Sequence, residues 1–388
     1  MNQLQKHSRV DVADVLRGFA VMAIILLHSI EHFNFYRYPD TADQCGFLNF
    51  TDSAIWDGMF FAFGGKAYAI FALLFGFSYF IQYDNQRLRG SDFRARFCWR
   101  LVLLFVIGNF NAAFFTGEIL VLYSLVGFIL PLTCRLSDRK LLAVAILLLI
   151  QPLPLIYVIN SLVDPTFVTP VIPTKALWGA TRAMQGEGSF FEMVAVNLKE
   201  GQLASLAWAW DHGRIFQSAA LFILGMLIGR RSLFTAENVS FWSRVLAYSL
   251  IIFFPLYGLG NTLPEFITHK ETLSPLKLII TSWSNLAFMF ILVSGIIIAY
   301  HKSSLKGFMS HIIPYGKMSL TNYITQSIFG SMLFYYWGFG LAMKVGITGS
   351  IGIGAVLFII QYAFCRWWMS NHNHGPMEYI WKRATWLK

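Results

Sequence analysis

Apolar runs recur from one end of this sequence to the other, and they constrain its fold more than any other feature. A helix needs about 20 mostly apolar residues to cross the hydrocarbon core of a bilayer. Runs of roughly that length occupy residues 14–36, 58–82, 98–115, 118–134, 141–159, 212–229, 243–260, 278–300, 312–337 and 342–366. We therefore predict an all-α polytopic membrane protein, with about ten transmembrane helices in one bundle and a single integral membrane domain over residues 1–388.

The composition excludes an ordinary soluble domain. Charged residues make up 13% of the chain and hydrophobic residues 56%, whereas soluble domains carry about 25% charged residues. Too few polar side chains remain to cover a soluble surface. The net charge of +10 does not indicate nucleic-acid binding, because no basic stripe on a soluble module is visible.

The basic residues gather in short connections between the apolar runs. Three groups stand out: Arg87, Arg89, Arg94, Arg96 and Arg100; Arg135, Arg139 and Lys140; and Arg230 and Arg231. Cytoplasmic loops of membrane proteins carry such an excess of Lys and Arg, and anionic lipid headgroups are their natural partners. Alternating the predicted spans from a cytoplasmic N-terminus puts every arginine-rich connection inside. We therefore expect both termini in the cytoplasm and membrane lipid as a partner.

The same alternation places three longer segments outside, at residues 37–57, 160–211 and 261–277. The longest begins with prolines and ends in Trp208 and Trp210, with apolar and charged residues mixed at helical spacing. This pattern predicts an interfacial helix that leads into the next span. The C-terminal tail, residues 370–388, likewise predicts an amphipathic helix at the inner surface.

The first apolar run carries ionisable residues at a spacing that matches one helix face. His28 follows Arg17 by eleven positions, which is about three helical turns and roughly 16 Å of rise, so both side chains lie on nearly the same face. Glu31 and His32 continue this arc toward the outside. Ionisable groups at such depth are costly and normally face a bundle interior or a water-filled cavity. We expect the chemistry of the protein on this helix.

Each of these residues also has a structural interpretation. Arg17 fits an inner anchor that reaches the headgroups and pairs with Asp14 at i−3. His28 fits a histidine buried for packing alone, and His32 fits a solvated side chain near the outer interface. The letters HSIEH, residues 28–32, also match the inverted zinc-peptidase pattern H-x-x-E-H. No third ligand follows in a matching context, so we expect no metal.

Polar residues in the ninth predicted span form a stripe on one helix face. Ser319, Asn322 and Gln326 occupy positions i, i+3 and i+7 of that span. One interpretation is interhelical hydrogen bonding, which is common where polar residues occur in membrane bundles. The other interpretation is the lining of a channel for a donor substrate.

Two further groups of charged residues lie at or inside the outer ends of spans. Asp211, His212 and Arg214 cluster at the start of the sixth span, either where an acceptor substrate binds or as an interfacial charge cluster. Lys66 lies deeper than most lysines. Unless it snorkels to the interface, it needs an anionic partner, either a carboxylate such as Glu31 or a bound ligand. Glu118 opens the fourth span and is expected to be only a helix-start charge.

Several stretches resemble known families. DVLRGFAVMAIILLH, residues 14–28, resembles the first-helix motif of the membrane-bound acyltransferase-3 family, with Asp14 before Arg17, Gly18 after it and His28 at its end. The segments GKMSLTNYITQSIFGSMLFYYWGFG (316–340), CRWWMSNHNHGPMEYIWKRATW (365–386) and ILGMLIGR (223–230) resemble the YeiB-like family of bacterial membrane proteins. Many YeiB-like proteins carry Asn at the position of His28, and this departure moves the chain toward the acyltransferases with a histidine base.

The resemblance implies membership of a transmembrane acyltransferase superfamily, which includes the lysosomal heparan-glucosamine acetyltransferase, and a multi-pass location in the bacterial cytoplasmic (inner) membrane. It implies transfer of an acetyl or other short acyl group from cytoplasmic acetyl-CoA, or another acyl-CoA, to an extracytoplasmic saccharide hydroxyl or amine. Arg17 would contact the CoA phosphates. His28 would be the general base or a transient acyl carrier, and Glu31 would orient it or share its proton.

The remaining candidates divide between the two substrates. Lys66, Asn322 and Gln326 would join Arg17 in binding the donor, whereas His32, Asp211, His212 and Arg214 would bind the acceptor. A proton-coupled transporter or exporter of a small molecule is the main alternative, with the intramembrane His and Glu as a proton relay. Such transporters more typically show repeat symmetry and broken helices in matching halves, which this sequence does not show. A structural role is the third interpretation, and the sequence leaves room for a homo-oligomer.

Overall fold

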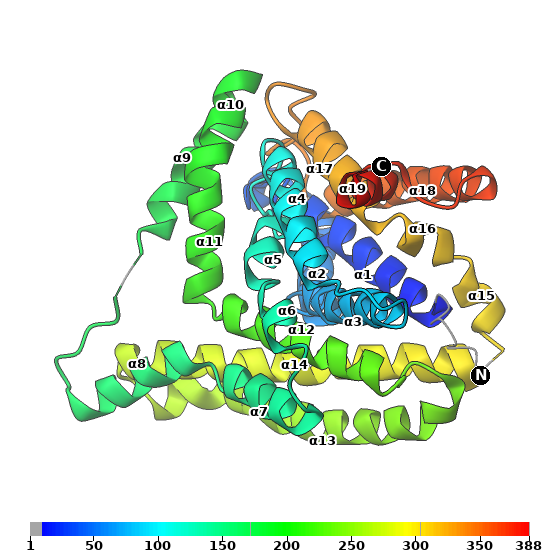
Figure 1. Cartoon of the computed structure of the whole chain (residues 1–388). Coiled ribbons are helices and arrows are strands. Elements are labelled where there is room, and N and C mark those ends of the chain that lie inside the picture. The colour runs from blue at the N-terminus through cyan, green and yellow to red at the C-terminus, as the bar shows by residue number, and fades with distance from the viewer. Residues whose placement is uncertain (1–9, 171, 303, 388) are drawn as a thin grey trace.

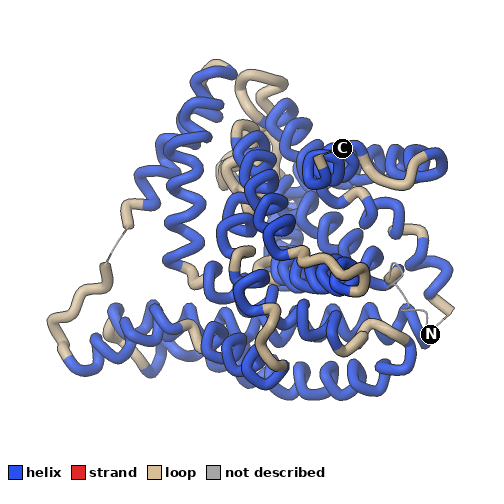
Figure 2. The backbone as a smooth tube through the Cα atoms, in the orientation of Figure 1, coloured by secondary structure: helices blue, strands red, loops and turns tan. Residues whose placement is uncertain are grey.

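The regular structure in the described part of the chain is helical. The computed structural model describes residues 10–170, 172–302 and 304–387, and Figure 2 shows helices and loops but no strand among them. The α-helices are α1 (Asp11–Ile30), α2 (Gly46–Phe63), α3 (Ala67–Arg87), α4 (Arg94–Ala112), α5 (Leu120–Val126), α6 (Ile129–Thr133), α7 (Asp138–Leu149), α8 (Pro152–Val163), α9 (Thr174–Glu187), α10 (Phe190–Val196), α11 (Gln202–Asp211), α12 (Arg214–Arg230), α13 (Val239–Phe266), α14 (Lys270–Lys302), α15 (Lys306–Ser310), α16 (Ile313–Lys317), α17 (Ser319–Phe334), α18 (Ile347–Asn371) and α19 (Pro376–Trp386). Short helical turns add η1 (Thr41–Asp43), η2 (Asn197–Gly201) and η3 (Ala236–Asn238). The all-α prediction is confirmed for these residues.

Within the described residues, five helical segments are long and apolar enough to cross a membrane. They are Asp11–Ile30, Gly46–Arg87, Ala236–Phe266, Lys270–Lys302 and Ile347–Asn371. The number rises to seven if two bent pairs each form one span, Asp138–Leu149 with Pro152–Val163 and Phe190–Asp211 with Arg214–Arg230. This is consistent with a multi-pass membrane protein. The number is lower than the ten predicted spans, because runs such as 118–134 and 312–337 fold as shorter helices.

Helix α1 lies at the centre of the bundle (Figure 1), where it contacts α2, α3, α16, α17 and α18. Its apolar stretch is 78% buried, whereas the corresponding stretches of α13 and α18 are only 22% buried. Asp11 and Asp14 lie in its first turn, where negative charge complements the helix dipole. The outer helices α13 and α18 instead expose apolar side chains, as helices that face lipid do.

Two crossings near α1 depend on glycine. Where α3 crosses α12, a Cβ on Gly76 would overlap the carbonyl oxygen of Phe222, and a Cβ on Gly225 would overlap that of Leu73. Where α16 crosses α1, a Cβ on Gly316 would overlap the backbone of the first turn of α1 in the same way. Small residues let the backbones of membrane helices approach this closely. The crossings therefore fix α1, α3, α12 and α16 in a tightly packed group.

Three predicted segments differ in detail from the structure. The predicted span 58–82 is interrupted, because α2 ends at Phe63 and α3 begins at Ala67, with Gly65 between them at a φ of 74°, a region that favours glycine. The predicted interfacial helix in 160–211 is instead a set of helices, α9, α10 and α11, that pack together at one edge of the molecule (Figure 1). The predicted tail helix is present as α19, which packs against α4 and α17.

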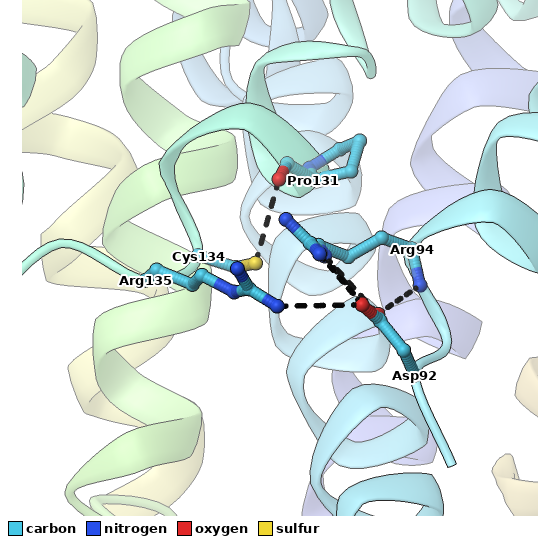
Figure 3. Close-up of polar contacts among 5 residues, drawn as sticks. All are labelled: Asp92, Arg94, Pro131, Cys134 and Arg135. Carbon is cyan, nitrogen blue, oxygen red and sulfur yellow. Dashed lines mark hydrogen bonds and ion pairs between the residues drawn. The ribbon is translucent and has the colours of Figure 1, made fainter.

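The arginine-rich connections gather on one surface through ion pairs. Asp92, between α3 and α4, accepts hydrogen bonds from Arg94 at 2.6 Å and from Arg135 at 3.5 Å (Figure 3). Hydrogen bonds from Arg94 lower the pKa of Asp92 to about 2. Asp138, at the start of α7, lies 3.2 Å from Arg230 at the end of α12. The three basic groups of the sequence thus come together in space.

Candidate functional site

The C-terminal end of α1 opens into a cavity of about 730 Å³, which we call the His28 cavity. Its walls come from α1, the break between α2 and α3, the segment before α5, and α9, α11, α12 and α14. Among its lining residues are His28, Glu31, His32, Tyr36, Lys66, Tyr68, Glu118, Lys175, Trp178, Arg182, Trp208, Arg214 and Asn285. The structure thus brings the ionisable end of the first helix into one chamber with aromatic and basic side chains.

His28 is surrounded by rings. Its ring centroid lies 4.5 Å from that of Phe115, 5.5 Å from that of His32 and 6.4 Å from that of Tyr323. Its Nδ1 atom is buried and has no hydrogen-bond partner among the described residues. Buried polar atoms without a partner are rare, and they mark places where a ligand or an ordered water is expected. An imidazole in this position is suited to accept a proton from a bound substrate.

The expected direct contact between Glu31 and His28 is absent from this site. Helix α1 ends at Ile30, so regular helical spacing does not continue through Glu31 and His32. Glu31 accepts a hydrogen bond from Tyr36 at 3.2 Å and lies 3.6 Å from Nε2 of His32. The ring of His32 meets that of His28 edge-on. The carboxylate therefore reaches the candidate base only through His32.

Arg17 lies near the other end of α1, where two cavities meet. One is a wide vestibule of about 1040 Å³, which we call the Arg17 vestibule; its basic lining residues are Arg17, Arg89, Arg100, Lys317, Lys382 and Arg383. The other is a narrow cavity of about 120 Å³. Arg17 donates to Asp14 at 2.5 Å and to the hydroxyl of Ser78 at 2.6 Å. The predicted pair with Asp14 is present, and these bonds hold the guanidinium at the boundary of the two cavities.

The narrow cavity ends one layer of side chains away from the His28 cavity. Leu120 lines the narrow cavity, while its neighbour Ile119 lines the His28 cavity. Tyr323 also lines the narrow cavity, and its ring lies beside that of His28. Three hollows therefore follow α1 in series: the Arg17 vestibule, the narrow cavity and the His28 cavity.

Lys66 lies in the His28 cavity rather than beside Arg17, although the sequence grouped it with the donor-binding residues. It immediately precedes α3, whereas Ser78, the partner of Arg17, lies on that helix twelve residues later. Twelve residues of helix span about 18 Å. Lys66 is therefore at the depth of His28, on the side predicted for the acceptor.

The charged cluster at the start of α12 divides between two environments. Arg214 lines the His28 cavity, whereas Asp211 and His212 are not among its lining residues. His212 stacks on Trp208 with ring centroids 4.6 Å apart, and its Nδ1 lies 2.9 Å from the carbonyl oxygen of that residue. Gly213, at a φ of 62°, makes the sharp turn between α11 and α12. This turn separates Arg214 from its two neighbours.

The polar stripe of α17 lies inside the bundle. Asn322 donates to the carbonyl oxygen of Tyr315 at 3.0 Å and accepts from Sγ of Cys365 at 3.2 Å, as the interhelical interpretation predicts. Gln326 is fully buried, and its amide atoms have no partner among the described residues. Neither residue lines the three hollows, whereas Ser319 lines both the narrow cavity and the vestibule. Donor binding by Asn322 and Gln326 stays a prediction.

Some residues of the site were not predicted. Glu118, expected to be only a helix-start charge, lines the His28 cavity and accepts hydrogen bonds from the side chain of Asn111 and the backbone N–H of Leu120. Lys175 and Arg182 reach the cavity from α9. The available signal was their charges within residues 160–211, a segment predicted to carry an amphipathic helix. Only the tertiary packing of that segment brings both side chains to the His28 cavity.

The geometry does not favour the zinc-peptidase interpretation of residues 28–32. A catalytic zinc site needs three protein ligands as well as an open position. Among the described residues, no group of three or more His, Cys, Asp or Glu side chains is placed to hold a metal ion. The pair His28 and His32 therefore has no third ligand within the described structure.

Comparisons with known proteins find relatives along nearly the whole chain. The chain is 26% identical to the uncharacterized protein YxaH of Bacillus subtilis (strain 168), over 98% of this chain and 95% of that protein. It is 22% identical to an uncharacterized 39.9 kDa protein in the amylase 3' region of Bacillus acidopullulyticus, over 99% of this chain and 96% of that protein. No solved structure matches it.

Two matches bear on the family. The uncharacterized protein YeiB of Escherichia coli (strain K12) is 24% identical to this chain, over 96% of the chain and 95% of YeiB. The family described as Protein of unknown function (DUF418) matches residues 228–388, the region that contains the two C-terminal segments of the sequence resemblance. Together these matches support a YeiB-like family for this chain.

Proposed function

We propose that this protein is an integral membrane acyltransferase of the transmembrane acyltransferase superfamily. It would move an acetyl or other short acyl group from acyl-CoA to an acceptor that arrives from the opposite side of the membrane. One observation carries the proposal: three hollows lie in series along α1, with Arg17 between the first two and His28 in the third. A transferase needs separate access for two substrates and one point where the reacting groups are held together.

The inner hollows have properties that suit an acyl-CoA. The Arg17 vestibule is wide and rich in arginine and lysine, which favours binding of the nucleotide phosphates. The narrow cavity that follows is lined mainly by apolar and aromatic side chains, which suits the slender pantetheine arm. Arg17 and His28 are eleven residues apart on α1, or about 16 Å. That span is comparable to an extended pantetheine arm, so the thioester would lie near His28.

His28 acts as the general base in this proposal. It removes the proton from an acceptor hydroxyl or amine, whose oxygen or nitrogen attacks the thioester carbonyl carbon. The tetrahedral intermediate then collapses, the C–S bond breaks, and the thiolate of CoA takes the proton back from His28. The products are the acylated acceptor and free CoA thiol. Burial of His28 among rings keeps water from competing with the acceptor.

The proposal also includes an orientation of the protein in the membrane. The Arg17 vestibule would face the cytoplasm, because its basic residues belong to the connections and the tail expected inside by the positive-inside rule. The His28 cavity would then open to the extracytoplasmic side of a bacterial cytoplasmic membrane, and both termini would be cytoplasmic. About ten membrane segments, some of them shorter than a full span, would make up this arrangement.

Release of free thiol from acetyl-CoA tests the proposal. Purified protein in nanodiscs receives acetyl-CoA with and without a panel of sugars, amino sugars and sugar acids. We expect acceptor-dependent thiol release by the wild-type protein and none by His28→Ala. Equal release by both proteins with every acceptor would overturn the proposal, and uptake of an acceptor into proteoliposomes without CoA would support a transporter instead.

A further inference from the structure

Lys66 is a buried cation without a counter-charge. Its side chain is only 6% exposed, and it forms no ion pair among the described residues. Its Nζ donates to the carbonyl oxygen of Phe60 at 3.3 Å and lies 5.4 Å from the ring centroid of Phe288. One long hydrogen bond and an aromatic ring do not neutralise an ammonium group. Buried charges are normally paired, because the loss of hydration is otherwise too costly.

Arg214 is in a similar state in the same cavity. Its Nη1 donates to the hydroxyl of Tyr68 at 2.5 Å and to the side-chain oxygen of Gln217 at 3.1 Å. Its guanidinium lies over the rings of Tyr68 and Trp208, at 4.5 and 5.4 Å. These partners are all neutral, and Nε is buried without a hydrogen-bond partner. The side chain is therefore held in place while its charge stays uncompensated.

Arg214 and Asn285 approach the backbone turn to which Lys66 belongs. A Cβ placed on Gly65 would lie 2.8 Å from Nδ2 of Asn285 and 3.4 Å from Nη2 of Arg214, and Lys66 is the next residue. Gly65 has no Cβ, so this space stays open. Lys66, Arg214 and Asn285 all line the His28 cavity. Three hydrogen-bond donors, two of them charged, thus line the same cavity around the break between α2 and α3.

The carboxylates of the cavity are engaged elsewhere. Glu31 is bonded to Tyr36 and His32, and Glu118 is bonded to a side-chain amide and a backbone N–H. Neither forms an ion pair with Lys66 or Arg214 in the described structure. Asp57, which lines an adjoining cavity together with Lys66, forms no ion pair with it among the described residues either. An anion from outside the protein would supply the missing counter-charge.

We propose that Lys66, Arg214 and Asn285 form a binding site for an oxyanion, a carboxylate or phosphate group carried by the acceptor. This inference rests on the proposed function, because it assigns the His28 cavity to the acceptor. It narrows the acceptor from saccharides in general to those with a negative group. Arginine with a second cation and an amide matches the several acceptor oxygens of such a group. A neutral sugar would leave both charges unpaired.

The oxyanion can arrive by two routes. A second cavity of about 670 Å³ shares Phe60, Lys66, Thr281 and Asn285 with the His28 cavity and lies between α2, α13 and α14. Its edge carries Tyr257, which is 45% exposed on the apolar face of α13. An anionic lipid headgroup could therefore reach Lys66 from the membrane, and a water-soluble acid could reach it through the His28 cavity. Both supply the same oxyanion chemistry.

Calorimetric titration of the full chain in phosphatidylcholine nanodiscs, without acyl-CoA, tests the site. The probes are glucose 6-phosphate, glucuronate and glucose. We expect one of the two anionic sugars to bind about tenfold or more tightly than glucose, and Lys66→Met to abolish this preference. Lys199→Met, which removes an exposed surface lysine outside the cavity, should keep it. A second arm replaces part of the lipid with phosphatidic acid and measures the melting temperature. A rise in the wild-type protein that is missing in Lys66→Met identifies the lipid route.

The same variant separates ligand binding from a structural role. Removing an uncompensated buried charge should raise the apparent melting temperature of ligand-free Lys66→Met while weakening anion binding. If Lys66 only supported the fold, replacing it with Met would lower the melting temperature. If none of the anions, soluble or lipid, shows Lys66-dependent binding, the site does not exist. If the protein prefers anionic sugars in a Lys66-dependent way but releases no CoA thiol, the anion site is supported and the acyltransferase proposal is overturned.

Discussion

Arg17 and the groups around His28, at the two ends of α1, differ in how far their hydrogen-bonding capacity is met. At the Arg17 end, the guanidinium is bonded to Asp14 and Ser78. Arg100, which lines the same cavities as Arg17, is an exception, since its Nε has no partner among the described residues. At the His28 end, Nδ1 of His28 and Nε of Arg214 have no partner among the described residues, and Lys66 has no counter-charge. A satisfied network fixes a side chain in one place, whereas an incomplete one is completed by a ligand. In the proposed mechanism, Arg17 is held in place before the donor binds, whereas the His28 cavity is completed by its ligand.

Replacing His28, the proposed general base, should have the largest effect. We expect His28→Ala and His28→Asn to lower kcat for acyl transfer by about 10²- to 10⁴-fold, because neither residue can take the acceptor proton. His311→Ala, at an exposed histidine outside the cavities, should match the wild type. Thiol release from acetyl-CoA measures the effect, and near-normal turnover by His28→Asn would mean that the imidazole is not the base.

The packed group around α1 should tolerate added bulk poorly. Gly225→Ala puts a Cβ into the carbonyl oxygen of Leu73, so α3 and α12 must separate. We expect a loss of about 1–3 kcal/mol in stability, seen as a lower melting temperature in nanodiscs. Gly258→Ala on α13 meets nothing within 4 Å and should be neutral or stabilising. Equal melting temperatures for both variants would contradict the close crossing.

Replacing Arg17 should weaken binding of acetyl-CoA while leaving His28 in place. We expect Arg17→Gln to raise KM for acetyl-CoA about tenfold, roughly the worth of one charge-assisted hydrogen bond, with a smaller change in kcat. Arg87→Gln is the matched control, since Arg87 pairs with an aspartate at i−3, as Arg17 does, but is 65% exposed and lines none of the three cavities. Steady-state kinetics at several acetyl-CoA concentrations measure both constants. An unchanged KM in Arg17→Gln would remove Arg17 from the donor site.

The smallest effect should come from the surface pair at Asp92. Its pKa is lowered from 3.8 to about 2 by hydrogen bonds from Arg94, so its contribution is present above pH 4 and is lost as the pH falls through about 2. Because the pair is exposed, Asp92→Asn should cost less than about 1 kcal/mol at pH 7. Melting curves should converge with those of the wild type as the pH falls below 4. A constant difference across that range would exclude this ion pair as the cause.

Helical periodicity predicted some of the site and missed other parts for identifiable reasons. The prediction that Arg17 and His28 share one helix is confirmed, because α1 is unbroken between them. The contacts of Glu31 with Tyr36 and His32 were not predicted, because no glycine or proline marks the end of α1 at Ile30; a catalytic role for Glu31 stays a prediction. The sequence predicts one span over residues 58–82, because Gly64 and Gly65 lie inside a continuous apolar run, whereas the structure has a break there. Hydropathy alone does not locate such a break.

Contacts between distant segments were beyond sequence reasoning. Lys66 and Arg214 lie far apart in the chain and meet only because α3 and α12 cross at glycines. Lys175 and Arg182 enter the same cavity from a segment predicted to lie at the membrane surface. The class of the protein followed from its apolar runs, but the composition of the His28 cavity depends on tertiary packing that no local pattern encodes.

A sided transfer assay tests the central claim most directly. Proteoliposomes of one orientation receive labelled acetyl-CoA on the Arg17 side, with acceptor sealed on the His28 side. The account predicts that labelled, acylated acceptor appears only on the His28 side, that free CoA thiol stays on the Arg17 side, and that His28→Ala abolishes both. Acylated acceptor on the same side as CoA, or acceptor movement without acyl transfer, would contradict the claim that the two substrates meet at His28.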